Sequence, residues 1–268
     1  MPTGSSYGRR TNNTKRHFDR LGPSESALAQ FLYPFAFRDV VFWWDDFTQG
    51  STTLSDNYTL GTDACSTAFA KNAGLGGRIQ GVTQAAANDY IAILTGADWL
   101  GDNNAGQEMR WQTDNIVTSK WEQGFTDPLG DNTLPALSDI DTPSIANCGT
   151  DVAAIVRDTG QTLTTGAFLT DGGTACFNTT ATTLACSYTG TNSVYRATRI
   201  QIATNAAAGF VFGACNCLVA SAQHGDTTAN SIEGGTALTA RLTYGTLACT
   251  AKTVTIDYWA IWMDRFIP

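Results

Sequence analysis

The chain has 268 residues, of which 43% are hydrophobic and 15% charged, and its formal net charge is -8. A chain with this much apolar sequence can bury a sizeable core, so its composition excludes wholesale disorder. It contains no apolar run of the ~20 residues that a membrane-spanning helix needs, and its beginning lacks the hydrophobic stretch of a secretory signal. We therefore expect a protein without membrane contact that is made and used, at least at first, in the cytoplasm.

The first 23 residues are a basic arm. They hold five of the 16 basic side chains and one of the 24 acidic ones, which leaves 11 against 23 in the remainder, a charge of -12. The arm has no hydrophobic periodicity, so we expect it to become ordered only against a partner; the alternative is a tail without a role. Basic and aromatic side chains alternate along it, as is typical of docking on an acidic surface. The candidate binding residues are Arg9, Arg10, Lys15, Arg16, His17, Phe18 and Arg20.

A short helix is expected after the arm, over Ser24–Leu32, because Pro23 and Ser24 can start it and Pro34 limits it. We therefore divide the chain into an arm with a helix, 1–38, and a globular domain, 39–268. The domain opens with an aromatic strand over 39–47.

The middle of the chain alternates short apolar segments with turn signals. From Thr48 to Gly61 it is polar and is expected to leave the sheet. In Gln107–Thr113, Met109 and Trp111 share one side, opposite Glu108 and Arg110. Residues 128–147 are expected to form a long irregular connection. Further strands are expected at 90–94, 121–127 and 151–157, with hairpin-like pieces at 166–173 and 175–188.

The last third predicts two strand pairs. Residues 195–203 and 210–219 read as a hairpin around a turn that contains Asn205 and Gly209. Leu238–Tyr244 is expected to pair with the closing strand, 253–265.

The closing strand is apolar at almost every position, so both of its faces are expected to be covered. Strict alternation would place Val254, Ile256 and Tyr258 with Ala260 and Trp262 on one side, opposite Trp259, Ile261 and Met263. The opening and closing strands are expected to share one core. Many short strands at regular spacing predict an all-β sandwich or jelly roll.

Several segments resemble one family. They are the Trp-Asp-Asp-Phe opening at 43–47, in which the tryptophan is doubled, Glu108-x-Arg110, Gly124–Asp127, Asp158-Thr159, the hairpin around Arg199 and Phe210, and the closing strand through Arg265. Over roughly 39–266 the chain resembles the concanavalin A-like jelly-roll proteins of tailed-phage virions.

The resemblance implies a phage virion structural protein, most simply a capsid decoration or cement protein. Its partner would then be the major capsid protein, with the arm in an acidic groove between capsid subunits. A homo-oligomer is implied as well, and three-fold junctions in capsids favour a trimer. The alternatives are a carbohydrate-binding module for host adhesion, a head or tail fibre part, and an arm that binds packaged DNA inside the shell, which we disfavour.

The seven cysteines are an odd number, so they cannot all pair internally. Cys176 and Cys186 bracket a hairpin and could bridge, and Cys215 and Cys217 would share a face. Free, buried thiols are the simpler interpretation. Both histidines, His17 and His224, lie far from any cysteine pattern that binds zinc, so no metal is expected.

Enzymatic motifs are absent from the sequence. Glycosidases need two carboxylates flanking the bond, yet the chain has four glutamates and no paired-acid motif. Glu108 is expected to pair with Arg110, and Asp45, Asp46, Asp257 and Asp264 to serve in turns or ion pairs near strand ends. Neither histidine lies beside a nucleophile elbow, and the glycine clusters lack a phosphate-loop lysine. Asn- and Asp-rich stretches such as 101–104 are commoner as turns than as calcium sites. We therefore expect a protein that is not an enzyme and needs no cofactor.

Overall fold

The computed structural model describes most of the chain from residue 40 onward, so the arm and the expected helix over 24–32 lie outside it. All seven cysteines also lie outside the described residues, and with them the expected Cys176–Cys186 bridge and the Cys215–Cys217 pair. The described residues are 40–48, 54–63, 66–72, 77–86, 89–127, 137–139, 144–145, 151–159, 167–172, 182–183, 193–203, 206–212, 222–225, 237–248 and 250–264.

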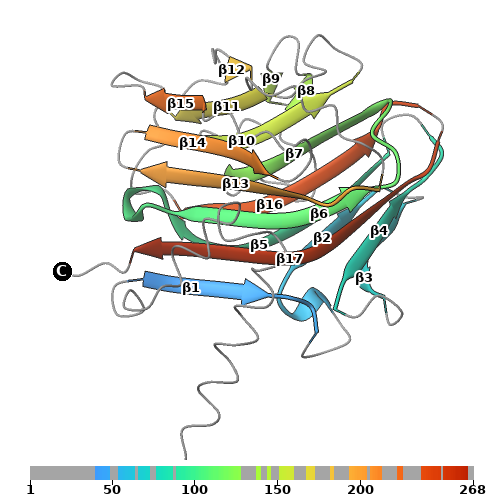
Figure 1. Ribbon diagram of the computed structural model, residues 1–268, viewed down its shortest axis with the longest axis horizontal. Coiled ribbons are helices and arrows are strands. Elements are labelled where there is room, and N and C mark those ends of the chain that lie inside the picture. The colour runs from blue at the N-terminus through green and yellow to red at the C-terminus, as the bar shows by residue number, and fades with distance from the viewer. Residues whose placement is uncertain are drawn as a thin grey trace, which may run out of the picture.

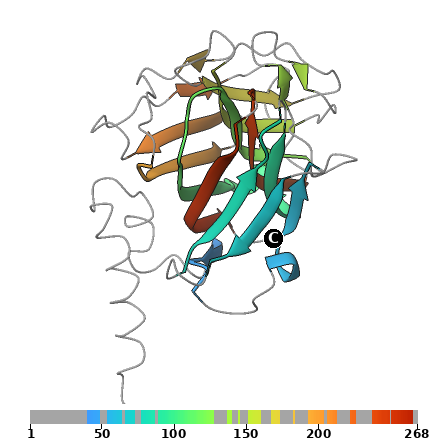
Figure 2. The ribbon, with the colours of Figure 1, turned by 90° about the vertical axis from the view of Figure 1, so that its right-hand side faces the viewer.

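The described strands form two large antiparallel sheets that face each other, as Figures 1 and 2 show. Sheet A contains, in spatial order, β15 (Ala222–Gly225), β14 (Ala206–Phe212), β13 (Arg196–Ala203), β6 (Gly106–Thr113), β17 (Lys252–Asp264), β4 (Ile79–Thr83) and β3 (Thr67–Lys71), and β1 (Val40–Asp45) also pairs with β17. Sheet B contains β12 (Thr182–Thr183), β11 (Ala167–Gly172), β10 (Asp151–Asp158), β7 (Ser119–Thr126), β16 (Ala237–Thr246), β5 (Tyr90–Leu100) and β2 (Thr59–Thr62). The predicted all-β sandwich is confirmed.

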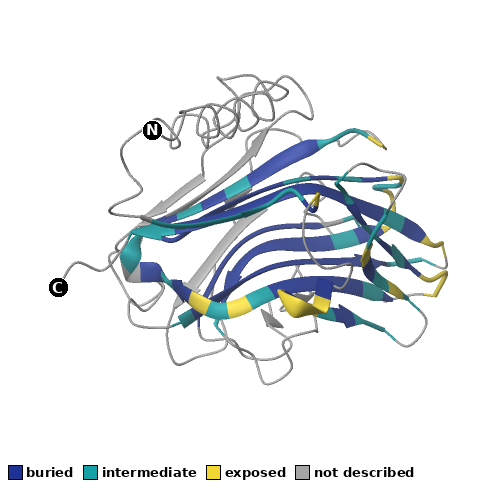
Figure 3. Cartoon of the chain, turned by 90° about the horizontal axis from the view of Figure 1, so that it is seen from below, coloured by how far each residue is buried: buried dark blue, intermediate teal, exposed yellow. Residues whose placement is uncertain are grey.

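The opening and closing strands lie side by side, as the sequence predicted. β1 pairs antiparallel with the C-terminal half of β17, from Val40 opposite Asp264 to Asp45 opposite Trp259. β6 runs along the other edge of β17. Residues 254–262 of β17 are all buried, and Figure 3 shows the buried colour along the central strands of both sheets. Both faces of the closing strand are thus covered, as expected.

The strict alternation expected in β17 is wrong, because the strand contains a β-bulge. Ile256 lies opposite Trp111, but the next partner, Arg110, lies opposite Tyr258, so Asp257 is an extra residue. Such a bulge shifts the side-chain alternation by one position. Val254 and Ile256 therefore share the core with Trp259 and Ile261, while Tyr258, Ala260 and Trp262 point away from it.

The expected pairing of residues 238–244 with the closing strand is also wrong. β16 lies in sheet B, between β5 and β7, whereas β17 lies in sheet A. Both strands carry core residues, such as Leu242 in β16 and Trp259 in β17. Because β16 and β17 lie in different sheets, their apolar sides face each other across the core. If the two strands were paired side by side in one sheet, these sides would not face each other.

Smaller differences concern segments expected to be turns or loops. β2 begins at Thr59, so the polar segment 48–61 ends in a strand of the other sheet. Residues 128–147 contain a small hairpin of β8 (Leu137–Asp139) and β9 (Ser144–Ile145). The hairpin of β13 and β14 is confirmed, but β14 begins at Ala206, so Gly209 lies in the strand rather than in the turn.

Aromatic side chains from both sheets fill the core. Tyr58 stacks on Trp259 with ring centroids 5.8 Å apart, and Trp43 contacts both edge-on. Trp111 of sheet A meets Trp121 of sheet B at 4.9 Å in a T-shaped contact. Such pairs add roughly 0.5–1.5 kcal/mol beyond the area they bury. The aromatic opening and closing strands therefore contribute directly to the packing between the sheets.

One polar side chain in this core lacks a hydrogen bond. Gln123 of β7 is fully buried between Trp121 and Phe125, and both amide atoms are without a partner in the described structure. Replacing Gln123 with Met should raise the free energy of unfolding by about 1–2 kcal/mol, because an unsatisfied buried amide costs roughly that much and Met has a similar volume. Urea unfolding followed by tryptophan fluorescence measures the change.

Gln107 of β6 provides the matched control. It is equally buried, but its Oε1 accepts a hydrogen bond from Nε1 of Trp259 at 3.0 Å. Gln107→Met leaves that indole N–H without an acceptor and should lower stability instead. If both replacements change stability in the same direction, the hydrogen-bond explanation is wrong.

Candidate functional site

The residues predicted to bind the capsid, Arg9 to Arg20 in the arm, lie outside the described residues, so the structure does not place them. The described chain instead assembles a polar and aromatic surface on sheet A. We call it the outer face, meaning the side of sheet A that points away from sheet B.

Strand pairing aligns the outer face in rows. Met109 and Trp111 of β6 belong to the core, so Glu108 and Arg110 point outward, as the sequence predicted. The rows across neighbouring strands are Gln80, Thr255 and Gln112; Tyr258, Arg110 and Ala197; Trp44, Ala260, Glu108 and Arg199; and Phe42, Trp262, Gly106 and Gln201.

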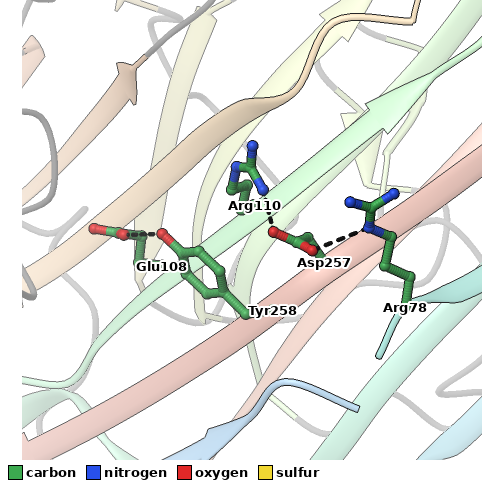
Figure 4. A network of polar contacts seen from close by, with 5 residues as sticks. All are labelled: Arg78, Glu108, Arg110, Asp257 and Tyr258. Atoms are coloured by element: carbon green, nitrogen blue, oxygen red, sulfur yellow. Dashed lines mark hydrogen bonds and ion pairs between the residues drawn. The ribbon is translucent and has the colours of Figure 1, made fainter. Parts of the chain in front are cut away.

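An ion-pair cluster occupies the centre of this face. Asp257, the bulge residue, accepts hydrogen bonds from Nε of Arg78 at 3.2 Å and from Nη1 of Arg110 (Figure 4). The Asp257 side chain is 5% exposed, against 29% for Arg78 and 15% for Arg110. The expected ion-pair role of Asp257 is confirmed, but the residue lies in the middle of the strand rather than near its end.

Glu108 lies next to this cluster and is fully buried. Its Oε1 accepts a hydrogen bond from the hydroxyl of Tyr258 at 2.5 Å (Figure 4). The expected Glu108–Arg110 pair is therefore replaced by two pairs, Glu108 with Tyr258 and Arg110 with Asp257. Burial raises the pKa of Tyr258 well above its ordinary value, and the charge of Glu108 adds to the shift, so Tyr258 remains a hydrogen-bond donor.

Tyr195, just before β13, lies between the two arginines. The guanidinium carbon of Arg110 is 4.3 Å from its ring centroid and that of Arg78 is 5.1 Å, which is cation–π geometry. Burial raises the pKa of Tyr195; both arginines oppose the shift and Asp257 adds to it. The hydroxyl is buried and has no hydrogen-bond partner in the described structure.

Trp262 forms the other end of the face. Its Nε1 donates to Oε1 of Gln201 at 3.1 Å, and the guanidinium of Arg199 lies 5.2 Å from the ring. A Cβ on Gly106 would lie 2.4 Å from the indole, so only glycine lets the ring lie here. Burial lowers the pKa of Arg199, and the nearby charge of Glu108 opposes that shift.

The remaining acidic candidates serve in turns and local contacts. Asp45 accepts hydrogen bonds from the backbone N–H of Phe47 at 2.6 Å and from the hydroxyl of Tyr58 at 3.0 Å, and Asp46 accepts one from Thr48. Asp264 accepts one from the side chain of Asn104. Residues 101–103 form a short 3₁₀ turn, η3, which ends at Asn104 in the left-handed conformation.

Among the described residues no three His, Cys, Asp or Glu side chains are grouped as a metal site, and no described helix has the length and apolarity to cross a membrane.

Comparison with known proteins identifies the fold. No protein-family model matches the sequence, and no curated protein matches it. Among solved structures, peanut lectin matches with a TM-score of 0.58 and 11% identity over 86% of this chain and 99% of the lectin. The fold is the concanavalin A-like jelly roll.

Two further structures match over similar lengths. The carbohydrate recognition domain of Emp47p has a TM-score of 0.53 and 11% identity, over 85% of this chain and 98% of that domain. The CBM2 module of the evolved Dit of Lactobacillus casei BL23 phage J-1 has a TM-score of 0.54 and 9% identity, over 86% and 98%. At these identities the matches show the fold alone, and the predicted fold class is confirmed.

Proposed function

We propose that the chain is a structural protein of a tailed-phage virion that attaches to the major capsid protein and stabilises the shell. The observation that carries the proposal is the division of charge, with +4 on the first 23 residues and -12 on the rest. A basic arm on an acidic jelly roll suits attachment through the arm, because the body repels an acidic shell surface that the arm attracts. The phage J-1 module, which shares the fold, is consistent with this origin.

The proposal does not include covalent chemistry. On the outer face of sheet A the two acids that would be candidates, Glu108 and Asp257, are both engaged internally. A glycosidase needs one carboxylate that can protonate the leaving group and a second one that faces the sugar. A fully buried Glu108 and an Asp257 held between two arginines serve as parts of a rigid scaffold instead.

Attachment is mechanical in this proposal. The arm orders along an acidic groove between capsid subunits, and the jelly roll covers the junction, as a trimer where the junction is three-fold. Charge-assisted hydrogen bonds from the arm add to the area that the body buries. Display on a lattice increases the effective affinity, because each bound copy holds its neighbours near their sites.

Deleting residues 1–23 tests the arm. We expect the shortened protein to keep its fold and to lose at least about tenfold in capsid occupancy, because the five basic side chains supply the charge-assisted contacts. Occupancy is the copy number per virion, measured by quantitative mass spectrometry, and the fold is checked by circular dichroism.

A full-length chain with Gln at all five basic arm positions is the matched control for arm length. It should lose occupancy nearly as strongly, and added salt should weaken the attachment of the natural chain. Undiminished occupancy of the shortened protein would overturn the role of the arm.

The second candidate function is carbohydrate binding at the virion surface. It is favoured by the outer face of sheet A, where the half-buried aromatic side chains of Phe42 and Trp44 lie in rows with Gln201 and Arg199. Aromatic rings with a few polar groups are typical of ligand sites. A glycan array probed with the full chain tests this function: selective binding supports it, and uniform absence of signal contradicts it.

A further inference from the structure

The centre of the outer face carries more positive charge and more donors than its acids can satisfy. Arg78 and Arg110 share one carboxylate, that of Asp257, so the three side chains carry a net charge of +1. Arg78 reaches Asp257 through Nε, which leaves its two terminal nitrogens directed elsewhere. A guanidinium has five N–H donors and no acceptor, so this cluster lacks acceptors.

Tyr195 adds a second, independent sign of a missing acceptor. Its hydroxyl is buried without a hydrogen-bond partner, although its ring lies against both guanidinium groups. A buried hydroxyl without a partner is destabilising by roughly 1–3 kcal/mol, so such groups in native proteins call for a water or a ligand. The hydroxyl can donate, because Tyr195 remains protonated at neutral pH.

The site can be reached through its arginines. Arg78 keeps 29% of its side chain exposed and Arg110 keeps 15%, whereas the acid beneath them is almost fully buried. The carboxylate of Asp257 therefore holds the two guanidinium groups in place, and the terminal N–H groups of Arg78 take no part in this ion pair. Preorganised donors of this kind bind a planar anion well, since little side-chain entropy is lost on binding.

We propose that Arg78, Arg110 and Tyr195 form a binding site for the carboxylate of an acidic oligosaccharide. A carboxylate fits because its two oxygens match the paired N–H groups of a guanidinium. A saccharide fits because the adjoining row on the same face offers the amides of Gln112 and Gln80, which can bind sugar hydroxyls, although Oε1 of Gln80 already accepts a hydrogen bond from Asn72 at 3.2 Å. The inference rests on the second candidate function, carbohydrate binding, and is independent of attachment through the arm.

The charge of the chain beyond the arm limits which acidic oligosaccharides can bind at this site. The chain beyond the arm carries -12, and the site supplies a local excess of one positive charge. A ligand with a dense row of acids would be repelled by the rest of the body over distances shorter than the ~8 Å screening length. The fitting ligand therefore has isolated carboxylates among neutral sugars.

An array of carboxylate-bearing oligosaccharides beside their neutral parents tests the site with the full chain. We expect at least one acidic member to bind more strongly than its neutral parent, and conversion of its carboxylate to the methyl ester should abolish the difference. If no acidic member exceeds its neutral parent, the proposal is wrong. Binding of an acidic peptide instead of every acidic sugar would overturn it in favour of a protein partner.

Titration calorimetry with the best acidic member tests the residues. Arg78→Gln should weaken binding about 10- to 100-fold, since it removes charge-assisted hydrogen bonds. Tyr195→Phe should weaken it about fivefold; because the hydroxyl has no internal partner, a purely structural role predicts no such loss. Lys120→Gln, which removes one positive charge from sheet B, is the matched control and should leave affinity unchanged.

Two further results separate this site from capsid attachment. The protein without residues 1–23 should bind the acidic sugar with unchanged affinity, and Arg78→Gln should keep full capsid occupancy. Thermal unfolding confirms that each variant is folded. Equal affinity of the natural chain and Arg78→Gln for the acidic sugar would overturn the proposal, whatever the arm does.

Discussion

Replacing Arg241 with Met should lower the free energy of unfolding by about 3–5 kcal/mol, because the change removes the buried positive charge that lies against the carboxylate of Glu122. Arg241 of β16 binds Glu122 of β7 at 3.0 Å, with side chains 1% and 6% exposed. The same nitrogen of Arg241, Nη2, also donates to the hydroxyl of Thr243 at 2.8 Å. Both charged groups lie on central strands of sheet B and are almost fully buried, so the pair is largely removed from water.

The double replacement Glu122→Gln with Arg241→Met is the control. It removes both charges, so it should be markedly more stable than Arg241→Met alone, as is general when a buried pair is replaced completely. Urea unfolding of both variants measures the difference. If the double variant is as unstable as the single one, loss of packing by the long arginine side chain explains the effect, and the charge does not.

The sequence was sufficient for features that depend on local pattern. Alternation in 107–113 placed Met109 and Trp111 in the core and Glu108 and Arg110 outside it. The aromatic opening and closing strands were expected to meet, and β1 pairs with β17. These predictions succeeded because a two-residue period and apolar run length report directly on which face of a strand is buried.

The bulge at Asp257 and the position of β16 could not be predicted from such patterns. A bulge adds one residue to an apolar strand, and when both faces are apolar the sequence does not show where alternation shifts. β16 and β17 are neighbours along the chain, and short-range reasoning favours pairing neighbours. Only the packing of one sheet on the other decides that they belong to different sheets.

The candidate site was missed for the same physical reason. Arg78 and Asp257 are 179 residues apart along the chain, and Glu108 and Tyr258 are 150 apart. Arg78 precedes a short strand and Tyr195 precedes β13, so neither belongs to a recognisable motif. The one useful signal in the sequence was Glu108-x-Arg110, which places both side chains on one face of the strand. The bulge brings Asp257 and Tyr258 beside them, and as a result Arg110 pairs with Asp257 and Glu108 with Tyr258.

Above pH 10 the protein should lose stability steeply, because three buried tyrosines resist ionisation in the folded state. Burial is the largest cause that raises the pKa of Tyr58, Tyr244 and Tyr258; nearby Asp45 adds to it for Tyr58 and Glu108 for Tyr258. Their folded pKa values lie above the unfolded value of about 10, so this stability is fully present below pH 10 and is lost as the pH rises above it. Between pH 10 and 11 Tyr58, whose folded pKa lies far above this range, should remove about 1 kcal/mol, and Tyr244 and Tyr258 act in the same direction.

Tyr58→Phe separates the tyrosine contribution from that of every other group. Tyr58 donates one hydrogen bond, to Asp45 at 3.0 Å, so its removal should be tolerated near neutral pH. Urea unfolding of the natural chain and of Tyr58→Phe at pH 8, 10 and 11 then gives two curves whose difference cancels lysine and arginine titration. Between pH 10 and 11 the variant should lose about 1 kcal/mol less than the natural chain, because it has one ionisable phenol fewer to bury. Parallel curves would mean that Tyr58 ionises as readily in the folded chain as in the unfolded one, and the packing of its ring between Trp43, Phe47 and Trp259 would not exclude water from its hydroxyl.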